Sequence, residues 1–297
     1  MRLNPLQRPD RSSLLAAESA TRRRARELGG SALWATAIAL VLVFSLFPIA
    51  WIFLTSIKAP ADAFAFPPKF LFSPTLQNYV SVFVGHDLLR YMFNSVVIAT
   101  GATLLSMLVG APAAYSFSRF RFRGRSALEV LVLMSRLIPQ IALLLPLYML
   151  YRELGLIDTH LGLILAYTTF VAPFTVFVLM GFFADIPRDL EEAALIDGCS
   201  PWGAFLRVVL PLSLPGLAAT FIFGFLYSWN EFMYAVILTG EGAKTLPVMI
   251  TGFITARGIE WGNIASAGSL ILLPVIIFVF LGSRGLIRGL TMGAVKE

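Results

Sequence analysis

Five stretches of this chain carry no charged residue, and each is long enough to cross a membrane as a helix. A helix needs about 20 apolar residues to span the roughly 30 Å hydrocarbon layer of a bilayer. Only 13% of the 297 residues are charged, against about 25% in soluble domains, and the mean hydropathy is +0.80. The sequence therefore excludes a water-soluble domain. The five stretches are 28–57, 91–118, 161–184, 208–230 and 261–283.

A sixth apolar stretch, 127–151, contains Glu129 near one end and Arg136 inside it. A charge that faces lipid costs a few kcal/mol on insertion scales. We still expect this stretch to span, because otherwise the loops on either side of it would not alternate across the membrane. The predicted fold class is an all-α polytopic membrane protein with six transmembrane helices.

The basic residues predict the orientation of these helices. Of the 23 Lys and Arg residues, 16 fall before the first span, after the sixth, or in the second and fourth loops. Cytoplasmic loops carry the excess of Lys and Arg, so both termini are predicted to be cytoplasmic. The predicted segments are a basic tail 1–31, a first transmembrane helix 32–57, an extracytoplasmic loop 58–90 stiffened by prolines, and a cytoplasmic tail 289–297.

Several kinds of chemistry lack the residues that they need. One cysteine, Cys199, cannot form a disulfide within the chain, and two histidines, His86 and His160, are too few for a zinc site unless distant segments converge. We assign no catalytic and no metal-binding residue. The net charge of +6 is explained by membrane orientation, so no nucleic-acid partner is expected.

The fourth loop, 185–213, is much longer than the usual connection of about 2 to 8 residues between helices. Pro187 and the acidic residues after it predict the start of a helix, which Gly198 should end. Ser200 and Pro201 then predict a second short helix, with Trp202, Phe205 and Val209 as its apolar stripe and Leu210–Pro211 at its end. The loop is predicted to present a helix–turn–helix to the cytoplasm.

The string EAALIDGCSPWGAFLRVVLPLSLPG, residues 192–216, resembles the EAA loop of permease subunits of binding-protein-dependent ABC importers. The segments GLIDTHLGLILAY at 155–167, SWNEF at 228–232 and the ending GLTMGAVKE are similar to the second permease of carbohydrate importers of the maltose type. The resemblance covers residues 33–297. The residues at the EAA-pattern positions are Glu192, Ala193, Ala194, Gly198, Val208, Leu210 and Pro211.

This resemblance implies a type I importer permease, with a core over 91–288, in a bacterial cytoplasmic membrane. It also implies that the loop seats in a cleft of an ATPase dimer. The further partners would be a second homologous permease, an extracytoplasmic sugar-binding protein and a di- or oligosaccharide, with membrane lipid around the helices. The coupling residues would be Glu192, Ala193, Ala194, Asp197, Gly198, Leu210 and Pro211.

The sequence agrees that the energy source lies on another subunit. A phosphate-binding loop needs Gly directly before Lys-Ser/Thr, and the candidate Lys244-Thr245 follows Ala243 instead. We therefore expect no cofactor on this chain, with ATP and Mg²⁺ bound by the partner ATPase, and no enzymatic activity of its own.

A sugar path needs hydroxyl, amide and aromatic groups that face the interior. Six residues in or next to the spans carry such groups, although each could instead serve in contacts between helices. Glu231 and Arg136 also motivate an alternative function, an ion-coupled secondary transporter; a membrane scaffold without transport is a second alternative. Arg136 could pair with Glu231 or with Glu129. The candidate path residues are Gln140, Tyr167, Thr168, Tyr227, Asn230 and Glu231.

The end of the chain is predicted to leave the membrane after Arg284 and Arg288. Gly289 and Gly293 should break the sixth helix. A nine-residue extended tail reaches about 30 Å, and the resemblance suggests that it contacts the ATPase interface.

The predicted topology can be tested by cysteine labelling. We expect a cysteine at Ser73, in the loop predicted to be extracytoplasmic, to react with a membrane-impermeant thiol reagent in intact or outer-permeabilised cells. The native Cys199, in the fourth loop, should not react. The reverse labelling pattern would overturn the orientation.

Overall fold

The computed structural model describes residues 11–256 and 258–292, with side chains over 34–256 and 258–280. The chain forms two compact units, one up to Leu54 and one from Thr55 onward. The first unit consists of helix α1, Arg11–Ser56, whose last residues belong to the second unit. The helix therefore begins inside the segment that we predicted as a separate tail. Its apolar part, Trp34–Ser56, is long enough to span a membrane.

Among the described residues, three further single helices are long and apolar enough to span: α4 (Leu88–Arg119), α7 (His160–Ala184) and α14 (Trp261–Met292). Two pairs of helices meet the same criterion but are bent, by 90° and by 76°. Six spans result when each bent pair counts as one, as the sequence predicted. The bent pairs are α5 (Arg125–Ser135) with α6 (Gln140–Glu153), and Pro201–Leu212 with α11 (Leu214–Trp229).

The stretch 127–151 is thus not one straight helix, which corrects our expectation. The break between α5 and α6 ends at Pro139. Proline lacks a backbone N–H and disfavours helical geometry in the residue before it, here Ile138. Arg136 lies in this break and not inside a helix.

The second helix of the fourth loop ends within one residue of its predicted end. α9 (Pro201–Ala204) continues through a π-helical turn, Phe205–Val209, into α10 (Leu210–Leu212), where the helix ends. The π-helical turn before Pro211 is a local adjustment of the kind that accommodates a proline in a membrane helix. The bend follows at Ser213, before α11 begins.

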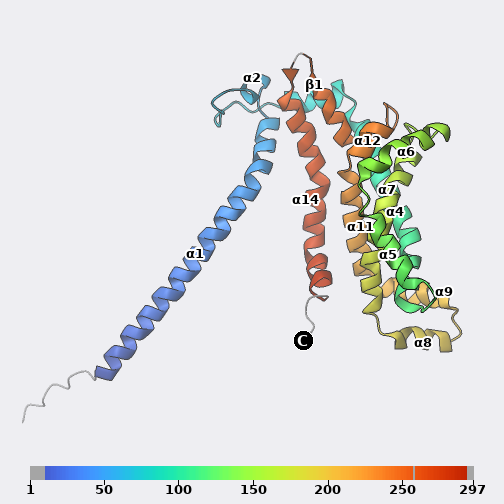
Figure 1. The fold of residues 1–297 in the computed structure, drawn as a ribbon. Helices are drawn as coiled ribbons and strands as arrows, with labels where there is room; N and C mark the ends of the chain where they lie inside the picture. Colours follow the sequence, from blue (N-terminus) through green and yellow to red (C-terminus); the bar gives the residue numbers. More distant parts are fainter. Residues whose placement is uncertain (1–10, 257, 293–297) are drawn as a thin grey trace, which may run out of the picture. The chain divides into compact units, whose positions relative to one another are not determined.

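The loop 58–90 is more ordered than the extended connection that its prolines suggested. The Asn78 side chain donates hydrogen bonds to the carbonyls of Ser56 (2.9 Å) and Lys58 (2.7 Å) and so holds the loop against the chain before it. A small antiparallel hairpin precedes α14 at the same end (Figure 1). The short elements at this end are α2 (Pro60–Ala63), α3 (Gln77–Val80), the π-helix Ser81–Gly85, α12 (Met233–Leu238), α13 (Leu246–Met249), the 3₁₀-helix Ile250–Phe253, β1 (Ile254–Thr255) and β2 (Gly258–Ile259).

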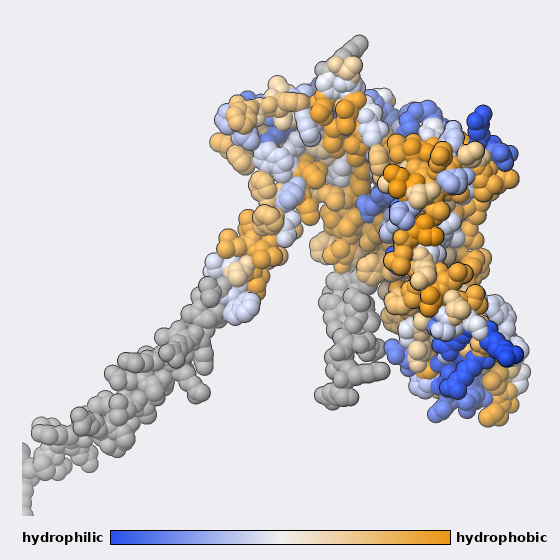
Figure 2. All heavy atoms as spheres, in the orientation of Figure 1, coloured by the Kyte–Doolittle hydropathy of each residue, from blue (hydrophilic) through white to orange (hydrophobic). Residues whose placement is uncertain are grey.

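Helices α4, α7 and α11 form the closely packed centre of the second unit. A Cβ on Gly101 of α4 would lie 2.7 Å from Ile164 Cδ1 of α7, and one on Gly110 would lie 2.8 Å from Thr175 Cγ2. A Cβ on Gly224 of α11 would lie 3.0 Å from α4 and from α7. Small residues let membrane helices approach closely. Apolar side chains cover the middle of this unit (Figure 2).

Helix α14 runs through Gly289 to Met292, so Gly289 does not break it. Glycine costs a helix about 1 kcal/mol relative to alanine, which a long helix tolerates. The predicted break at Gly293 and the tail 293–297 lie outside the described residues.

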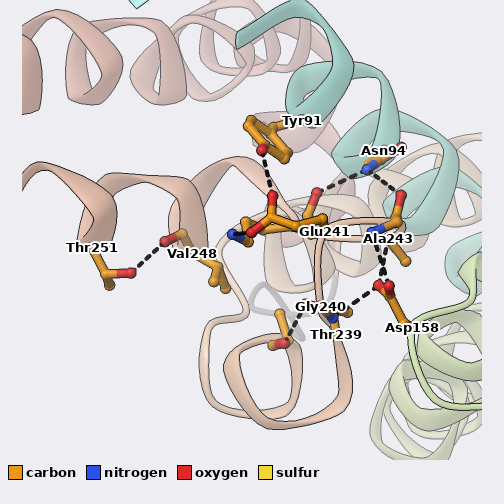
Figure 3. A network of polar contacts seen from close by, with 12 residues as sticks. Tyr91, Asn94, Asp158, Thr239, Gly240, Glu241, Ala243, Val248 and Thr251 are labelled. Atoms are coloured by element: carbon orange, nitrogen blue, oxygen red, sulfur yellow. Dashed lines mark hydrogen bonds and ion pairs between the residues drawn. The ribbon is translucent and has the colours of Figure 1, made fainter. Parts of the chain in front are cut away.

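A polar network ties the loop after α12 to the loop before α7 (Figure 3). The Asp158 carboxylate accepts hydrogen bonds from the backbone N–H groups of Gly240 (2.9 Å), Gly242 (2.9 Å) and Ala243 (2.8 Å). Burial alone would raise the pKa of Asp158, but these three donors and the charge of Arg90 outweigh it and hold the pKa below its ordinary value. The ionised carboxylate therefore stabilises the folded loop.

Asp158→Asn should lower the apparent unfolding temperature of the purified protein. Leaving a buried donor without its partner costs about 1–3 kcal/mol, and one kcal/mol shifts the midpoint by about 2 °C in a chain of this size. Asp62→Asn is the matched control, because the ion pair of Asp62 with the exposed Lys69 (2.6 Å) lies at the surface and its loss should cost little.

The same contact has a pH dependence. Because the pKa of Asp158 is lowered in the folded protein, its stabilisation is present above the ordinary carboxyl pKa and is lost as pH falls through the lowered value. An Asp158→Asn protein that unfolds at the wild-type temperature at neutral pH would contradict this assignment.

Candidate functional site

The segment 185–213 lies at one end of the second unit, and the hairpin and α2 lie at the other (Figure 1). Hydrophilic side chains gather at the end that carries α8 and α9 (Figure 2). The long fourth loop is therefore a terminal projection of the helix bundle.

The loop folds locally as its sequence predicted. Helix α8 spans Arg188–Ile196 and follows Pro187, with acidic residues in its first turn. Gly198 follows with a φ of +88°, which glycine adopts without strain. The Ser200 side chain then accepts a hydrogen bond from the backbone N–H of Gly203 (3.1 Å) and caps α9. The result is the predicted helix–turn–helix.

Most of the predicted coupling residues lie on the outside of this projection. Glu192, Ala193, Asp197, Gly198 and Pro211 are exposed, whereas Ala194 and Leu210 are half-buried.

Large apolar side chains are exposed beside these residues, namely Leu190, Ile196 (86%) and Trp202 (55%). Of the predicted apolar stripe, Phe205 and Val209 are buried, but Trp202 is not. A carboxylate surrounded by exposed apolar groups is typical of an interaction surface.

The inner side of α8 carries a contact that the sequence reading missed. Glu191 is buried and forms an ion pair with Arg119 of α4, with 2.5 Å between Oε1 and Nε. Its other oxygen accepts a hydrogen bond from the Tyr115 hydroxyl (2.8 Å). A 170 Å³ cavity borders this contact and reaches Glu192. In the sequence, Arg119 is one of the 16 basic residues that predict the orientation.

Some of the candidate path residues come together. Gln140 Nε2 donates to the Tyr227 hydroxyl (2.7 Å), and the Tyr227 ring packs on Phe170 with 4.9 Å between centroids. Tyr227 is 44% exposed. Asn230 is also exposed, with its amide donating to the Leu226 carbonyl. Thr168 donates within its own helix, to the Ile164 carbonyl (2.7 Å).

Two other path candidates lie inside the subunit. Tyr167 is fully buried, and Glu231 is 8% exposed. The Glu231 carboxylate accepts the backbone N–H groups of Tyr234 (2.9 Å) and Ala235 (3.2 Å) and so caps α12. In this structure both side chains are buried within the subunit and neither is exposed in the way that Tyr227 is.

The partner of Arg136 is neither of the two that we considered. Glu129 pairs with Arg125 (2.6 Å), and Glu231 is engaged at α12. The Arg136 guanidinium lies over the Phe174 ring, 5.5 Å from its centroid.

Within the part of the chain that the structure describes, no three His, Cys, Asp or Glu side chains are close enough to hold a metal ion. His160 instead hydrogen-bonds Asn94 (2.8 Å), and His86 packs against Phe253.

Known proteins match this arrangement over most of the chain. The Sinorhizobium fredii protein named probable ABC transporter permease protein y4oR is 37% identical over 95% of this chain and 100% of its own length. The trehalose transport system permease protein SugB of Mycobacterium tuberculosis is 38% identical over 89% of this chain and 97% of its own.

A chain from the crystal structure of a bacterial ABC transporter that imports alginate has the same fold. The TM-score is 0.72 at 19% identity, over 94% of this chain and 99% of that one. Residues 87–291 match the family described as binding-protein-dependent transport system inner membrane component. The chain belongs to this family of membrane-embedded permease subunits.

Proposed function

We propose that this chain is one permease subunit of an ATP-driven importer that moves a di- or oligosaccharide, or a related carbohydrate, inward by alternating access. The similarity to the trehalose permease SugB supports a sugar substrate. The similarity to the alginate importer supports the fold only, because the identity is 19%.

The observation that carries the proposal is the exposed projection formed by α8 and α9. It places Glu192, Ala193 and Gly198 on its outer surface, next to exposed Ile196 and Trp202. Small residues let another chain approach closely, and the carboxylate supplies a charged contact. We propose that an ATPase dimer, which binds ATP and Mg²⁺, docks here.

The remaining partners follow from this assignment. An extracytoplasmic binding protein would deliver the sugar to the end that carries β1 and α2, opposite the projection. A second permease would complete the membrane path, and lipid would cover the other apolar faces. This places the chain in a bacterial cytoplasmic membrane, with the projection and both termini in the cytoplasm.

This subunit's share of the sugar path is proposed to be the exposed group around Tyr227. The Tyr227 ring, the Gln140 amide and Asn230 combine an aromatic face with hydrogen-bonding groups, which suits a carbohydrate.

The ion-coupled alternative receives no support. Its main motivation was Glu231, whose carboxylate is occupied by two backbone N–H groups, and the family consists of ABC importer subunits.

Two substitutions in the projection test the ATPase assignment. We expect Glu192→Lys and Gly198→Val to abolish sugar-driven ATP hydrolysis in the reconstituted importer while the subunit stays in the membrane. Glu192→Lys reverses a contact charge. Gly198→Val forces a β-branched residue into positive φ, although a Cβ there would touch nothing within 4 Å.

Glu153→Lys is the matched control, since Glu153 is also exposed but lies at the end of α6. An importer that carries this variant should hydrolyse ATP at the wild-type rate. Wild-type uptake by both projection variants would remove the basis for the ATPase docking site.

A further inference from the structure

Two residues at the end of α4 hold three separate points of the segment 185–213. Tyr115 and Arg119 are one helical turn apart on α4, so they share a face of that helix. The residues that they contact are Ile186, Glu191 and Phe205, which lie before, within and after α8.

Each contact is specific. Arg119 Nε lies 2.5 Å from Glu191 Oε1, and Arg119 Nη2 donates to the Ile186 carbonyl (2.8 Å). The Tyr115 hydroxyl donates to Glu191 Oε2 (2.8 Å), and its ring packs on Phe205 with 4.7 Å between centroids. Helix α4 therefore contacts both oxygens of the Glu191 carboxylate, Oε2 through a hydrogen bond and Oε1 through an ion pair that lacks hydrogen-bond geometry.

Burial makes these contacts hard to separate. The Arg119 and Glu191 side chains are only 7% and 10% exposed, and the other three ion pairs among the described residues each have at least one partner that is more than 30% exposed. Parting a buried pair leaves two charges without compensation, which is strongly unfavourable. α8 therefore cannot shift relative to the end of α4 without a large energetic cost.

The chain itself connects the projection to other helices. α8 follows α7 after Asp185–Pro187, and α10 leads to α11 through the 76° bend at Ser213. Phe205 also packs on Phe183 of α7, with 6.0 Å between ring centroids. The buried ion pair of α8, however, is made with α4, which is far from α8 in sequence.

We propose that Arg119, Glu191 and Tyr115 are positioning residues that make α8 and the end of α4 move as one body. Resting on the proposed function, this means that a motion of the ATPase received at the Glu192 surface enters the membrane through α4. The two adjacent carboxylates have different roles. Glu192 is exposed and would contact the ATPase, whereas Glu191 is buried and holds α8 to α4. The close contacts of Gly101, Gly110 and Gly224 then carry the motion of α4 to α7 and α11.

The test uses the complete importer, with its second permease, ATPase and binding protein, in proteoliposomes. Glu191→Gln and Arg119→Met should each leave the ATPase bound and hydrolysing, because the outer surface of α8 is unchanged. The amount of sugar transported per ATP should fall by at least about tenfold, since the variants break a buried pair.

Glu129→Gln is the matched control. It breaks another Arg–Glu ion pair that joins the same types of atom, Arg125 Nε and Glu129 Oε1, at 2.6 Å. This pair lies within α5 and does not reach the projection. This variant should transport the wild-type amount of sugar per ATP.

Amide hydrogen exchange over 188–196 gives a readout that does not depend on transport. Exchange in α8 should speed up by at least about tenfold in Glu191→Gln and Arg119→Met but not in Glu129→Gln. If those two variants do not assemble, Tyr115→Phe can be tested in their place, because it keeps the ring packing and removes one hydrogen bond. The amount of sugar transported per ATP should then fall, but by less than in the other two variants.

The proposal would be overturned if the assembled variants transport as much sugar per ATP as the wild type, whether or not amide exchange in α8 changes. A wild-type complex that shows no sugar uptake dependent on the binding protein would instead refute the proposed function. The exchange data would still report whether α4 holds α8.

Discussion

The need to satisfy every backbone N–H and C=O group without water governs this fold. Inside hydrocarbon only continuous helices do so at low cost, which explains α4, α7 and α14. The helices break at Pro139 between α5 and α6 and at Ser213 before α11, whereas α4, α7 and α14 continue through Pro112, Pro173 and Pro274. A bundle of long and broken helices can rearrange at its breaks while its centre stays packed, as alternating access requires.

Polar chemistry is concentrated at the two ends of the second unit. At one end the Asp158 carboxylate accepts hydrogen bonds from three backbone N–H groups of the loop after α12. At the other end Arg119, Tyr115 and Glu191 fasten the α8 projection to α4. Both clusters join segments that are distant in sequence. The end with the projection also exposes Glu192, Ile196 and Trp202, the surface at which we propose that the ATPase docks.

Patterns of local origin were readable from the sequence. Charge-free runs placed the spans, and the spacing of the EAA residues with Gly198 and Ser200 predicted the helix–turn–helix. Features that depend on distant packing were not readable. Glu191 and Glu192 are neighbours, and only the position of Arg119 decides which of them turns inward. Arg136 had two plausible carboxylate partners in sequence, yet lies on Phe174 because both carboxylates are engaged elsewhere. Gly289 was expected to stop α14, but a long helix passes through it.

The most direct measurement of the central claim is the distance between α4 and α8 during the ATP cycle. Spin labels at Ser118 and Asp189, with Cys199 replaced by serine, would report it by pulsed electron resonance in the complete importer. If the Arg119–Glu191 pair makes one body of these helices, the distance distribution stays the same with and without ATP, within about 2 Å, the scale of small helix shifts. A larger change between the two states would show that α8 moves independently of α4 and would contradict the account.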